Sequence, residues 1–382
     1  MTIETSLTTR FNLSCPIIQA PMAGGGDTPA LVAAVSEAGG LGFIGANYST
    51  PAQIAEASQA VRDRSNRAFG INLFAPQPAP PPPGETGPAL ARLAPYHEEL
   101  GLPAPTPPAP PADTFDALLA AALDSGAASF SFTSGIPPRD AVEAIKQRGM
   151  FLMGTATTPA EAVALEAAGC DAIITQGAEA GGHRSTFDGE IDSGLIGTMA
   201  LVPQVAGAVS VPVVAAGGIM DGRGIAAALA LGAEAVQMGT AFLTCEEAGV
   251  PAAYKAALLA AEAADTRLTS AFSGKPARGV VNRFMRAAEA EADDGGDGIL
   301  PFPYQHALTR PMRAAAARQD RAELLSLWAG QGVGLARHRP AAVLVDELAR
   351  ELEAAIERLN GRVAAAQANR SATPERVRVK PA

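Results

Sequence analysis

The chain has little cysteine. Its 382 residues include three cysteines, Cys15, Cys170 and Cys245, which lie far apart and form no Cys-x-x-Cys pair. This spacing argues against a disulfide framework and against a zinc cluster, and it fits a reducing, cytosolic setting. We therefore expect no structural disulfide and no bound metal.

Long apolar runs and an excess of positive charge are also absent. The sequence has no uninterrupted apolar run of about 18 residues, so we expect no membrane span. Residues 1–10 are polar and lack the apolar segment of a signal peptide. Acidic residues outnumber basic ones by 39 to 29, giving a net charge of −10, which argues against nucleic acid or an anionic membrane as a partner. These absences predict a soluble cytoplasmic protein.

What the chain does have is a repeated pattern, in which a helical stretch ends at glycine and a short apolar run follows. Such runs are typical of strands buried on both faces, and their alternation with helices predicts a parallel sheet. The pattern occurs at 38–45, 148–154, 168–176, 211–218 and 231–239, and strands at Pro16–Ala20, Phe69–Leu73 and Ala128–Phe132 bring the count to eight. Eight such units favour a (β/α)₈ TIM barrel, with an open doubly wound sheet as the alternative.

The length of the chain leaves room for more than a barrel. We expect the barrel within residues 1–250, interrupted by a proline-rich loop or lid at 75–113, which contains 14 of the 31 prolines. Proline is excluded from helix interiors and central strands, so an extended loop is predicted there. Residues 251–370 are expected to form a mostly helical domain on the substrate side, because apolar residues recur at helical spacing in 342–360. Residues 371–382 are expected to be a frayed tail.

Glycine-containing corners follow three of the predicted strands. Gly217-Gly218 and Gln237–Thr240 come after the seventh and eighth strands, where the loops of barrels commonly bind phosphate through backbone N–H groups. The alternative is that these glycines only close tight corners. The segment Ala20–Gly26 follows the first strand and is suited to line a planar ring, with Met22 packing on it, or is a plain turn.

His183 is the strongest candidate for a catalytic residue. The sixth and seventh strands are separated by 40 residues, against 22 or 23 for neighbouring repeats, and the extra residues lie where barrels carry their catalytic loops. His183 lies in this loop, between Gly181-Gly182 and Arg184, and a histidine can exchange a proton near neutral pH. The alternative is a surface histidine bonded to backbone. No second histidine lies in the loop, so a metal cluster is not expected.

Several segments together resemble the nitronate monooxygenase family, also called the 2-nitropropane dioxygenase family. They occur in family order between residues 12 and 335, which is most of the chain. The segments are 16–25, 69–74, 176–184, 215–219, 237–242, 272–279 and 328–332, and Tyr96–Leu102 is similar to the region after the lid in longer bacterial members.

The resemblance implies an FMN-dependent barrel with a helical substrate domain. Ala20, Pro21, Met22 and Ala23 would line the isoalloxazine ring, Asn72 would hydrogen-bond to it, Gln176, Gly181 and Gly182 would contact the flavin and its ribityl chain, and Gly217, Gly218, Gln237, Met238, Gly239 and Thr240 would hold the phosphate. His183 would be the active-site base or an electrostatic partner beside the flavin.

The activity implied by the family is the oxidation of alkyl nitronates, and in some members nitroalkanes, by O₂. A one-electron transfer to FMN leads to a carbonyl compound and nitrite, and the protein orients the substrate. Some relatives place a histidine near the end of the fourth strand, but residues 129–135 contain none here, which leaves the substrate preference open. Ser131 and Tyr304 are the candidate substrate-pocket residues.

Two other functions remain open at this point. Related barrels share the Gly-Gly-His segment and the phosphate loops, so an NAD(P)H-dependent FMN reductase of a quinone or an enoyl thioester is the first alternative. A flavin-binding protein without turnover is the second. The expected partners are a small-molecule substrate and O₂, and a homodimer is left open.

Overall fold

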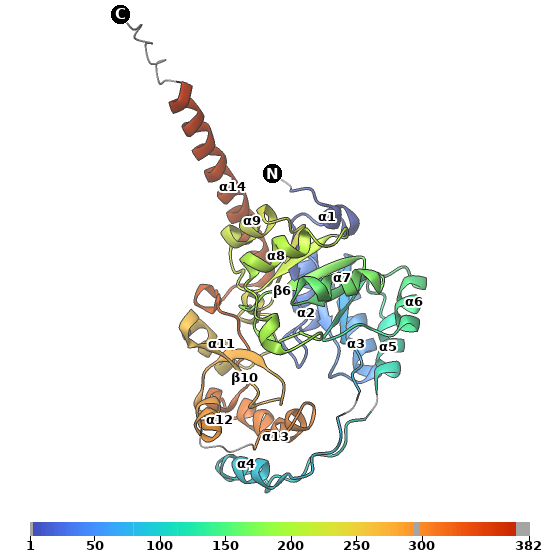
Figure 1. Cartoon of the computed structure of the whole chain (residues 1–382), viewed down its shortest axis with the longest axis vertical. Helices are drawn as coiled ribbons and strands as arrows, with labels where there is room; N and C mark the ends of the chain where they lie inside the picture. Colours follow the sequence, from blue (N-terminus) through green and yellow to red (C-terminus); the bar gives the residue numbers. More distant parts are fainter. Residues whose placement is uncertain (1–2, 79, 113, 294–297, 372–382) are drawn as a thin grey trace, which may run out of the picture.

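Eight parallel strands form a closed barrel, as predicted (Figure 1). The computed structural model describes residues 3–78, 80–112, 114–293 and 298–371. The strands follow the order β1-β9-β8-β6-β5-β4-β3-β2, and a bridge between Ile18 and Leu41 closes the ring. Their bounds are β1 Ile17–Gln19, β2 Gly42–Gly45, β3 Phe69–Phe74, β4 Ser129–Thr133, β5 Phe151–Ala156, β6 Ala172–Gln176, β8 Val213–Ala216 and β9 Ala235–Met238.

Helices alternate with these strands and surround the barrel (Figure 1). Threonine followed by proline begins three of them, α2, α3 and α7, where the Thr28, Thr50 and Thr158 side chains accept hydrogen bonds from first-turn N–H groups. Proline at the first helical position has the right φ and no N–H to leave unpaired. The helices are α2 Pro29–Glu37, α3 Pro51–Arg62, α5 Phe115–Leu123, α6 Arg139–Gln147, α7 Pro159–Ala167, α8 Thr198–Ala206 and α9 Gly222–Ala230.

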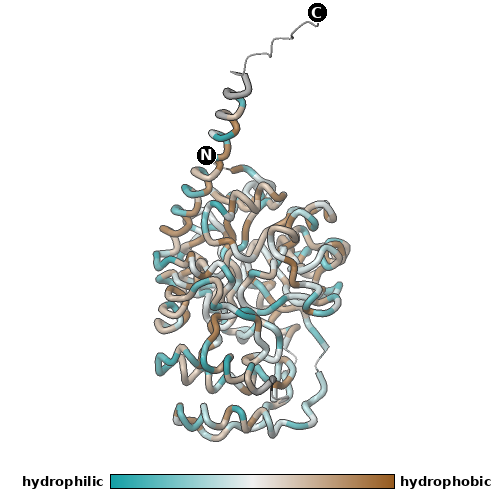
Figure 2. The backbone as a smooth tube through the Cα atoms, turned by 60° about the vertical axis from the view of Figure 1, so that its left-hand side comes forward, coloured by the Kyte–Doolittle hydropathy of each residue, from teal (hydrophilic) through white to brown (hydrophobic). Residues whose placement is uncertain are grey.

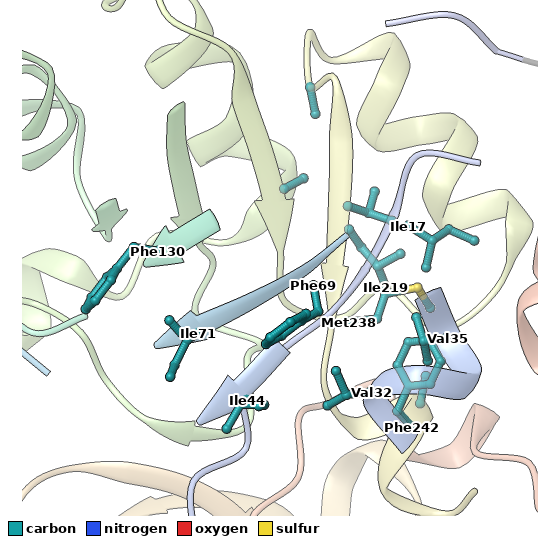
Figure 3. Packing of buried hydrophobic residues seen from close by; sticks show 14 of the residues in the cluster. Ile17, Val32, Val35, Ile44, Phe69, Ile71, Phe130, Ile219, Met238 and Phe242 are labelled. Carbon is teal, nitrogen blue, oxygen red and sulfur yellow. The ribbon is translucent and has the colours of Figure 1, made fainter. Parts of the chain in front are cut away.

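Alternate residues of each strand face opposite sides of the barrel wall. Ile17 of β1 and Ile44 of β2 point outward and pack under the helices, whereas Ile18 and Phe43 fill the barrel interior. Figure 3 shows part of the outer layer, with Ile44 and Ile71 on neighbouring strands. Both faces of the strands are therefore apolar, which is the physical reason that the strands were visible in the sequence.

The long C-terminal helix α14 (Ala341–Ser371) completes the ring of helices. It packs against α9 and α2, and its Leu344, Leu348 and Leu352 are buried in the same cluster as the outer faces of the strands. A Cβ atom on Gly222, at the start of α9, would come within 2.2 Å of the α14 backbone, so only glycine allows this approach. We expected α14 to belong to the 251–370 domain, and its first four turns instead cover the barrel.

The far end of α14 projects from the body of the protein (Figures 1 and 2). Leu359 and Val363 there are 54% and 56% exposed. Of the tail that we expected at 371–382, residues 372–382 lie outside the described part of the chain.

A second hydrophobic cluster lies beside the mouth of the barrel and is formed mostly by residues between β9 and α14. It contains Phe272, Phe284, Leu308 and Met312. The elements are α11 Ala252–Ala260, β10 Thr266–Thr269, β11 Ala277–Val280, α12 Arg283–Asp293 and α13 Tyr304–Arg318, and the shorter elements of the chain are α1 Ser6–Phe11, α10 Thr240–Leu243, η1 Ile191–Gly194, η2 Ala263–Asp265, η3 Ala322–Leu324 and η4 Val333–Leu335. Strand β11 pairs with β10 and also with β7 (Gly182–His183), both antiparallel.

The proline-rich segment differs from the extended loop that we expected. Helix α4 (Gly87–Glu99) lies in its middle, with Pro88 in the first turn and Pro95 inside the helix. Its Leu93 is buried in the second cluster, and the Glu99 carboxylate pairs with Arg283 at 2.5 Å. These tertiary contacts stabilise a helix that proline content alone argued against. Within the described residues, no helix has the length and apolar character needed to cross a membrane.

The position of α14 predicts a contrast between two leucines of one helix. Leu348→Ala removes a fully buried side chain from the barrel cluster, so we expect it to lower the free energy of unfolding by about 2–5 kcal/mol. Leu359→Ala, on the projecting part, should change it by less than about 0.5 kcal/mol. Urea denaturation of both variants checks this, and equal effects would contradict the packing of α14 on the barrel.

Candidate active site

A cavity of about 980 Å³ opens at the C-terminal ends of the barrel strands. Its other wall is formed by the region of the second cluster, including Trp328 and five residues of α13. All the residues that we expected to hold a flavin line it: Ala20, Pro21, Met22, Ala23, Asn72, Gln176, Gly181, Gly182, Gly217, Gly218, Gln237, Met238, Gly239 and Thr240. His183 and Ser131 line it as well.

The corners after β8 and β9 present backbone to this cavity. Gly217 and Gly218 have φ of 111° and 72°, a left-handed region that favours glycine. The Thr240 hydroxyl accepts a hydrogen bond from the Gly330 N–H at 3.0 Å, which ties the corner to the second cluster. The Gln237 Oε1 atom is buried and has no hydrogen-bond partner in the described part of the chain. An unpaired buried acceptor of this kind is costly unless a ligand donates to it.

The loop after β1 is held in place by a buried carboxyl group. Asp27 Oδ2 accepts hydrogen bonds from the Met22 N–H at 2.7 Å and from the Gly45 N–H at 2.5 Å. Burial raises the pKa of Asp27 to about 7, although both hydrogen bonds favour its ionised form. The Ala20–Ala23 wall is therefore fixed against the end of β2.

Two amide side chains of the cavity already have protein partners. Asn72 Nδ2 donates to the Ser131 carbonyl at 3.0 Å and to the Ser131 hydroxyl at 2.9 Å. Gln176 Nε2 donates to the His183 carbonyl at 3.0 Å, and its Oε1 accepts from the Ser185 N–H at 3.0 Å. Gln176 thus fixes the loop that carries His183 with both ends of its amide, so its side chain holds the loop as well as lining the cavity.

Arg184, which follows the candidate catalytic residue, holds the same loop from inside. Its side chain is fully buried, and its guanidinium donates to the carbonyls of Gln176, Gly177 and Gly194 at 3.0, 2.7 and 2.7 Å. Burial lowers the pKa of Arg184 to about 10, so the group stays charged at neutral pH. We assigned this residue no role from the sequence.

His183 lies at the cavity wall on the short strand β7. Its Nε2 is 2.9 Å from the Ser273 hydroxyl, which itself donates to the Lys275 carbonyl at 3.0 Å. When the Ser273 proton is donated to the Lys275 carbonyl, the hydroxyl oxygen accepts from Nε2, and the tautomer with the proton on Nε2 and a free acceptor at Nδ1 is the one that fits. Burial, and then the positive charges of Lys275 and Arg313 and the nearby His306, lower the pKa of His183 to about 3. The ring is therefore neutral at physiological pH.

Helix α13 contributes a wall that sequence reasoning missed. His306, Arg310 and Arg313 all line the cavity, and the His306 ring stacks on Tyr48 with centroids 4.6 Å apart. Arg313 donates to the His306 carbonyl at 3.0 Å and, among the described residues, pairs with no carboxylate. The Tyr48 hydroxyl is buried and has no partner there either. The spacing i, i+4, i+7 places the three residues on one helix face, a signal that was readable in the sequence.

Tyr304, which we expected in the substrate pocket, is not part of the cavity wall. It is buried at the first turn of α13, and its hydroxyl donates to the Pro80 carbonyl at 3.2 Å. His306, two residues later, lies about 200° further around the helix and lines the cavity instead. Tyr304 therefore attaches the proline-rich segment to α13.

Comparison with known proteins places this site in a family. The family model described as nitronate monooxygenase matches residues 5–351. The chain belongs to the nitronate monooxygenase family. A nitronate monooxygenase of Pseudomonas aeruginosa is 44% identical over 343 residues, which cover 88% of this chain and 96% of the relative. A probable nitronate monooxygenase of Staphylococcus saprophyticus is 40% identical over 353 residues, 92% of this chain and 98% of the relative.

Solved structures agree with this membership. A nitroalkane oxidase from Streptomyces ansochromogenes superposes with a TM-score of 0.83 at 45% identity, over 93% of this chain and all of that one. FabK from Thermotoga maritima gives a TM-score of 0.74 at 30% identity, over 94% of this chain and all of that one. Membership of the nitronate monooxygenase family makes this chain an oxidoreductase of a flavin-dependent family. In the described part of the chain, no cluster of three or more His, Cys, Asp or Glu side chains is arranged to bind a metal.

The low pKa values of His183 and His306, each about 3, predict how stability depends on pH in this nitronate monooxygenase family member. The unfolded chain binds a proton on each ring below about pH 6.5, and the folded chain does not, so the free energy of unfolding falls as the pH drops from 7 toward 4. Each ring contributes up to about 1.4 kcal/mol per pH unit.

Denaturation from pH 4 to pH 7, for the parent and His306→Asn, measures this slope. We expect a smaller slope in the variant, and NMR of the imidazole nitrogens should show neither ring titrating between pH 5 and 8. An imidazole that titrates near pH 6.5 would contradict its burial.

Proposed function

We propose that this protein is an FMN-dependent monooxygenase that oxidises alkyl nitronates with O₂ to carbonyl compounds and nitrite. One observation carries the proposal: a cavity with glycine corners at the ends of β8 and β9 faces a neutral His183 and the guanidinium of Arg313, which pairs with no carboxylate among the described residues. Such a cavity combines a surface for a planar cofactor with a positive charge for an anionic substrate. A nitronate is an anion.

The cavity fits FMN in three respects. Its volume is at the upper end of the roughly 300–1,000 Å³ that is usual for ligand sites. A Cβ atom on Gly182 would meet no atom within 4 Å, so the wall there leaves open space that a ligand can fill. The Gln237 Oε1 atom lacks a donor in the described part of the chain and borders the same space.

In this proposal each wall of the cavity holds one part of the cofactor. The isoalloxazine ring would be held by Ala20–Ala23 and by Asn72. The Asn72 amide nitrogen is engaged with Ser131, so its Oδ1 is the atom that remains for the ring. The phosphate is held by Gly217, Gly218 and the Gln237–Thr240 corner. When bound, FMN supplies the one-electron chemistry between nitronate and O₂.

The state of His183 favours a nitronate over a neutral nitroalkane. A general base is most effective when its pKa lies near the working pH, and burial lowers the pKa of His183 to about 3. The ring is therefore a weak base for the α-proton of a nitroalkane. A nitronate already lacks that proton, and its negative charge beside the ring raises the pKa of His183 again. His183 then binds and orients the anion, while Arg313 balances its charge.

A reductase that uses NADH or NADPH is the second candidate. The similarity to FabK, at 30% identity and a TM-score of 0.74, is the observation that keeps it. The glycine corners and the Gly181-Gly182-His183 segment hold a flavin equally well for either reaction. Reduction of the bound flavin therefore distinguishes the two functions.

The deciding experiment is anaerobic absorbance of the purified holoprotein. We expect propyl-2-nitronate to reduce the flavin, and NADH or NADPH in a second cuvette to leave it oxidised. Reduction by the nicotinamide alone would replace the monooxygenase with the reductase. Bound FMN that neither compound reduces would indicate a flavin-binding protein without turnover, and a purified protein that binds no FMN would remove the cofactor assignment.

Substitution of His183 tests its role as the anion-orienting group. His183→Asn keeps a donor for Ser273 but loses the ring, and we expect kcat/KM for propyl-2-nitronate to fall by about 10²-fold with FMN still bound. Ser273→Ala is the matched variant, because it keeps the imidazole ring but removes the hydroxyl that hydrogen-bonds to its Nε2 atom. We expect an intermediate loss and an altered pH profile. Unchanged kinetics in His183→Asn would end the catalytic assignment.

A further inference from the structure

The hairpin of β10 and β11 contacts the loop that carries His183 at three points, and of these only Ser273 enters the function proposed so far. Its Ser273 hydrogen-bonds to His183, the Pro276 carbonyl accepts from the Arg184 N–H at 2.8 Å, and Arg278 Nε donates to the Ala178 carbonyl at 3.0 Å. The turn thus holds the loop at both sides of His183. The side chain of Lys275, in the turn of this hairpin, extends away from the His183 loop toward the end of β4.

Lys275 reaches the end of β4 on the cavity wall. Its Nζ donates to the Ser134 hydroxyl at 2.8 Å, and Ser134 lines the cavity. The Ser134 backbone is in the left-handed region with φ of 64°, and the Gln77 side chain donates to its carbonyl at 2.8 Å. The ammonium group of Lys275 is therefore one hydrogen bond away from the cavity.

This ammonium group belongs to a half-buried side chain and has no paired carboxylate among the described residues. The carboxylate whose charge acts on it, Glu161 of α7, is engaged with the Thr157 and Phe187 N–H groups at 2.5 and 2.6 Å. Keeping a charge out of water is costly unless an anion compensates it. The positive charge of Lys275 is therefore suited to stabilise an anion that forms in the cavity.

We propose that Lys275 stabilises the superoxide anion formed when O₂ takes one electron from the reduced flavin. This inference rests on the proposed function and deepens it. In the step, the flavin loses one electron and O₂ gains it; no bond breaks and no proton moves, so a neutral molecule becomes an anion beside the flavin. A fixed cation lowers the free energy of such a step because it needs no reorganisation.

The other groups around the cavity are less suited to this role. His183 on β7 and His306 on α13 are neutral, because burial lowers the pKa of each to about 3. Arg313 lies on α13, and in the proposed function its guanidinium balances the negative charge of the nitronate. Burial lowers the pKa of Lys275 to about 8, so its charge is present below pH 8 and is lost above it.

Stopped-flow mixing of the reduced, FMN-loaded protein with O₂ tests the proposal. We expect the second-order rate constant for reoxidation to fall by about 10- to 100-fold in Lys275→Met, somewhat less than for removal of a donor in direct contact. Lys275→Arg keeps the charge and should retain most of the rate. In the parent the rate constant should decline above pH 8, and in Lys275→Met it should not depend on pH there.

Two further readouts separate an electrostatic role from a structural one. The midpoint potential of bound FMN should become more negative in Lys275→Met and stay near the parent value in Lys275→Arg. Anaerobic reduction by propyl-2-nitronate should fall less than reoxidation by O₂ does in Lys275→Met, and it should stay near the parent value in Lys275→Arg, which keeps the charge beside His183.

The outcomes are distinguishable from failure of the proposed function. A parental reoxidation rate in Lys275→Met, or equal losses in Lys275→Met and Lys275→Arg, would overturn the role of Lys275 while the flavin is still reduced by nitronate. If Lys275→Met does not bind FMN, the pH dependence of the parent decides, and a rate constant that stays flat through pH 8 overturns the role. A parent protein that nitronate does not reduce would overturn the proposed function itself.

Discussion

The pairing of β7 with β11 is the interaction on which the rest of the site depends. It aligns His183 with Ala277 and Gly182 with Arg278, and thereby joins a loop of the barrel to a hairpin that follows β9 by some distance in the chain. Only this register places Ser273 against the imidazole and Lys275 against the end of β4. The barrel supplies the cofactor walls, but the tautomer and the charge around His183 come from the hairpin.

The electrostatics of the cavity run opposite to those of the whole chain. The protein carries a net charge of −10, yet the charged groups that act on His183 include Lys275 and Arg313, both partly buried and cationic. Composition therefore argued against nucleic acid as a partner but gave no information about the sign of the charge on the substrate. Local charge is set by which side chains the fold buries, and the excess of carboxylates on the surface is screened by water and salt.

The barrel was predictable because each strand is apolar on both faces and each corner is marked by glycine. The residues proposed to hold the flavin followed from those corners and from the family resemblance. Tyr304 and His306 show where this reasoning ends: both lie on α13, and which of them faces the cavity is decided by the rotation of a helix packed against the second cluster. Likewise α14 has an apolar stripe that fits either domain, and its packing on α9 and α2, with a close approach at Gly222, assigns it to the barrel.

The insertion between β9 and α14 also affects the order in which the protein can fold during its synthesis. All eight strands have been translated by Met238, but the helix that packs on α9 and α2 begins only at Ala341. A ribosome adds about 5–20 residues per second, so the outer apolar face at the seam of the barrel waits roughly 5–20 seconds for its cover. During this interval the nascent barrel exposes an uncovered apolar face, and exposed apolar surface of this kind is what chaperones bind.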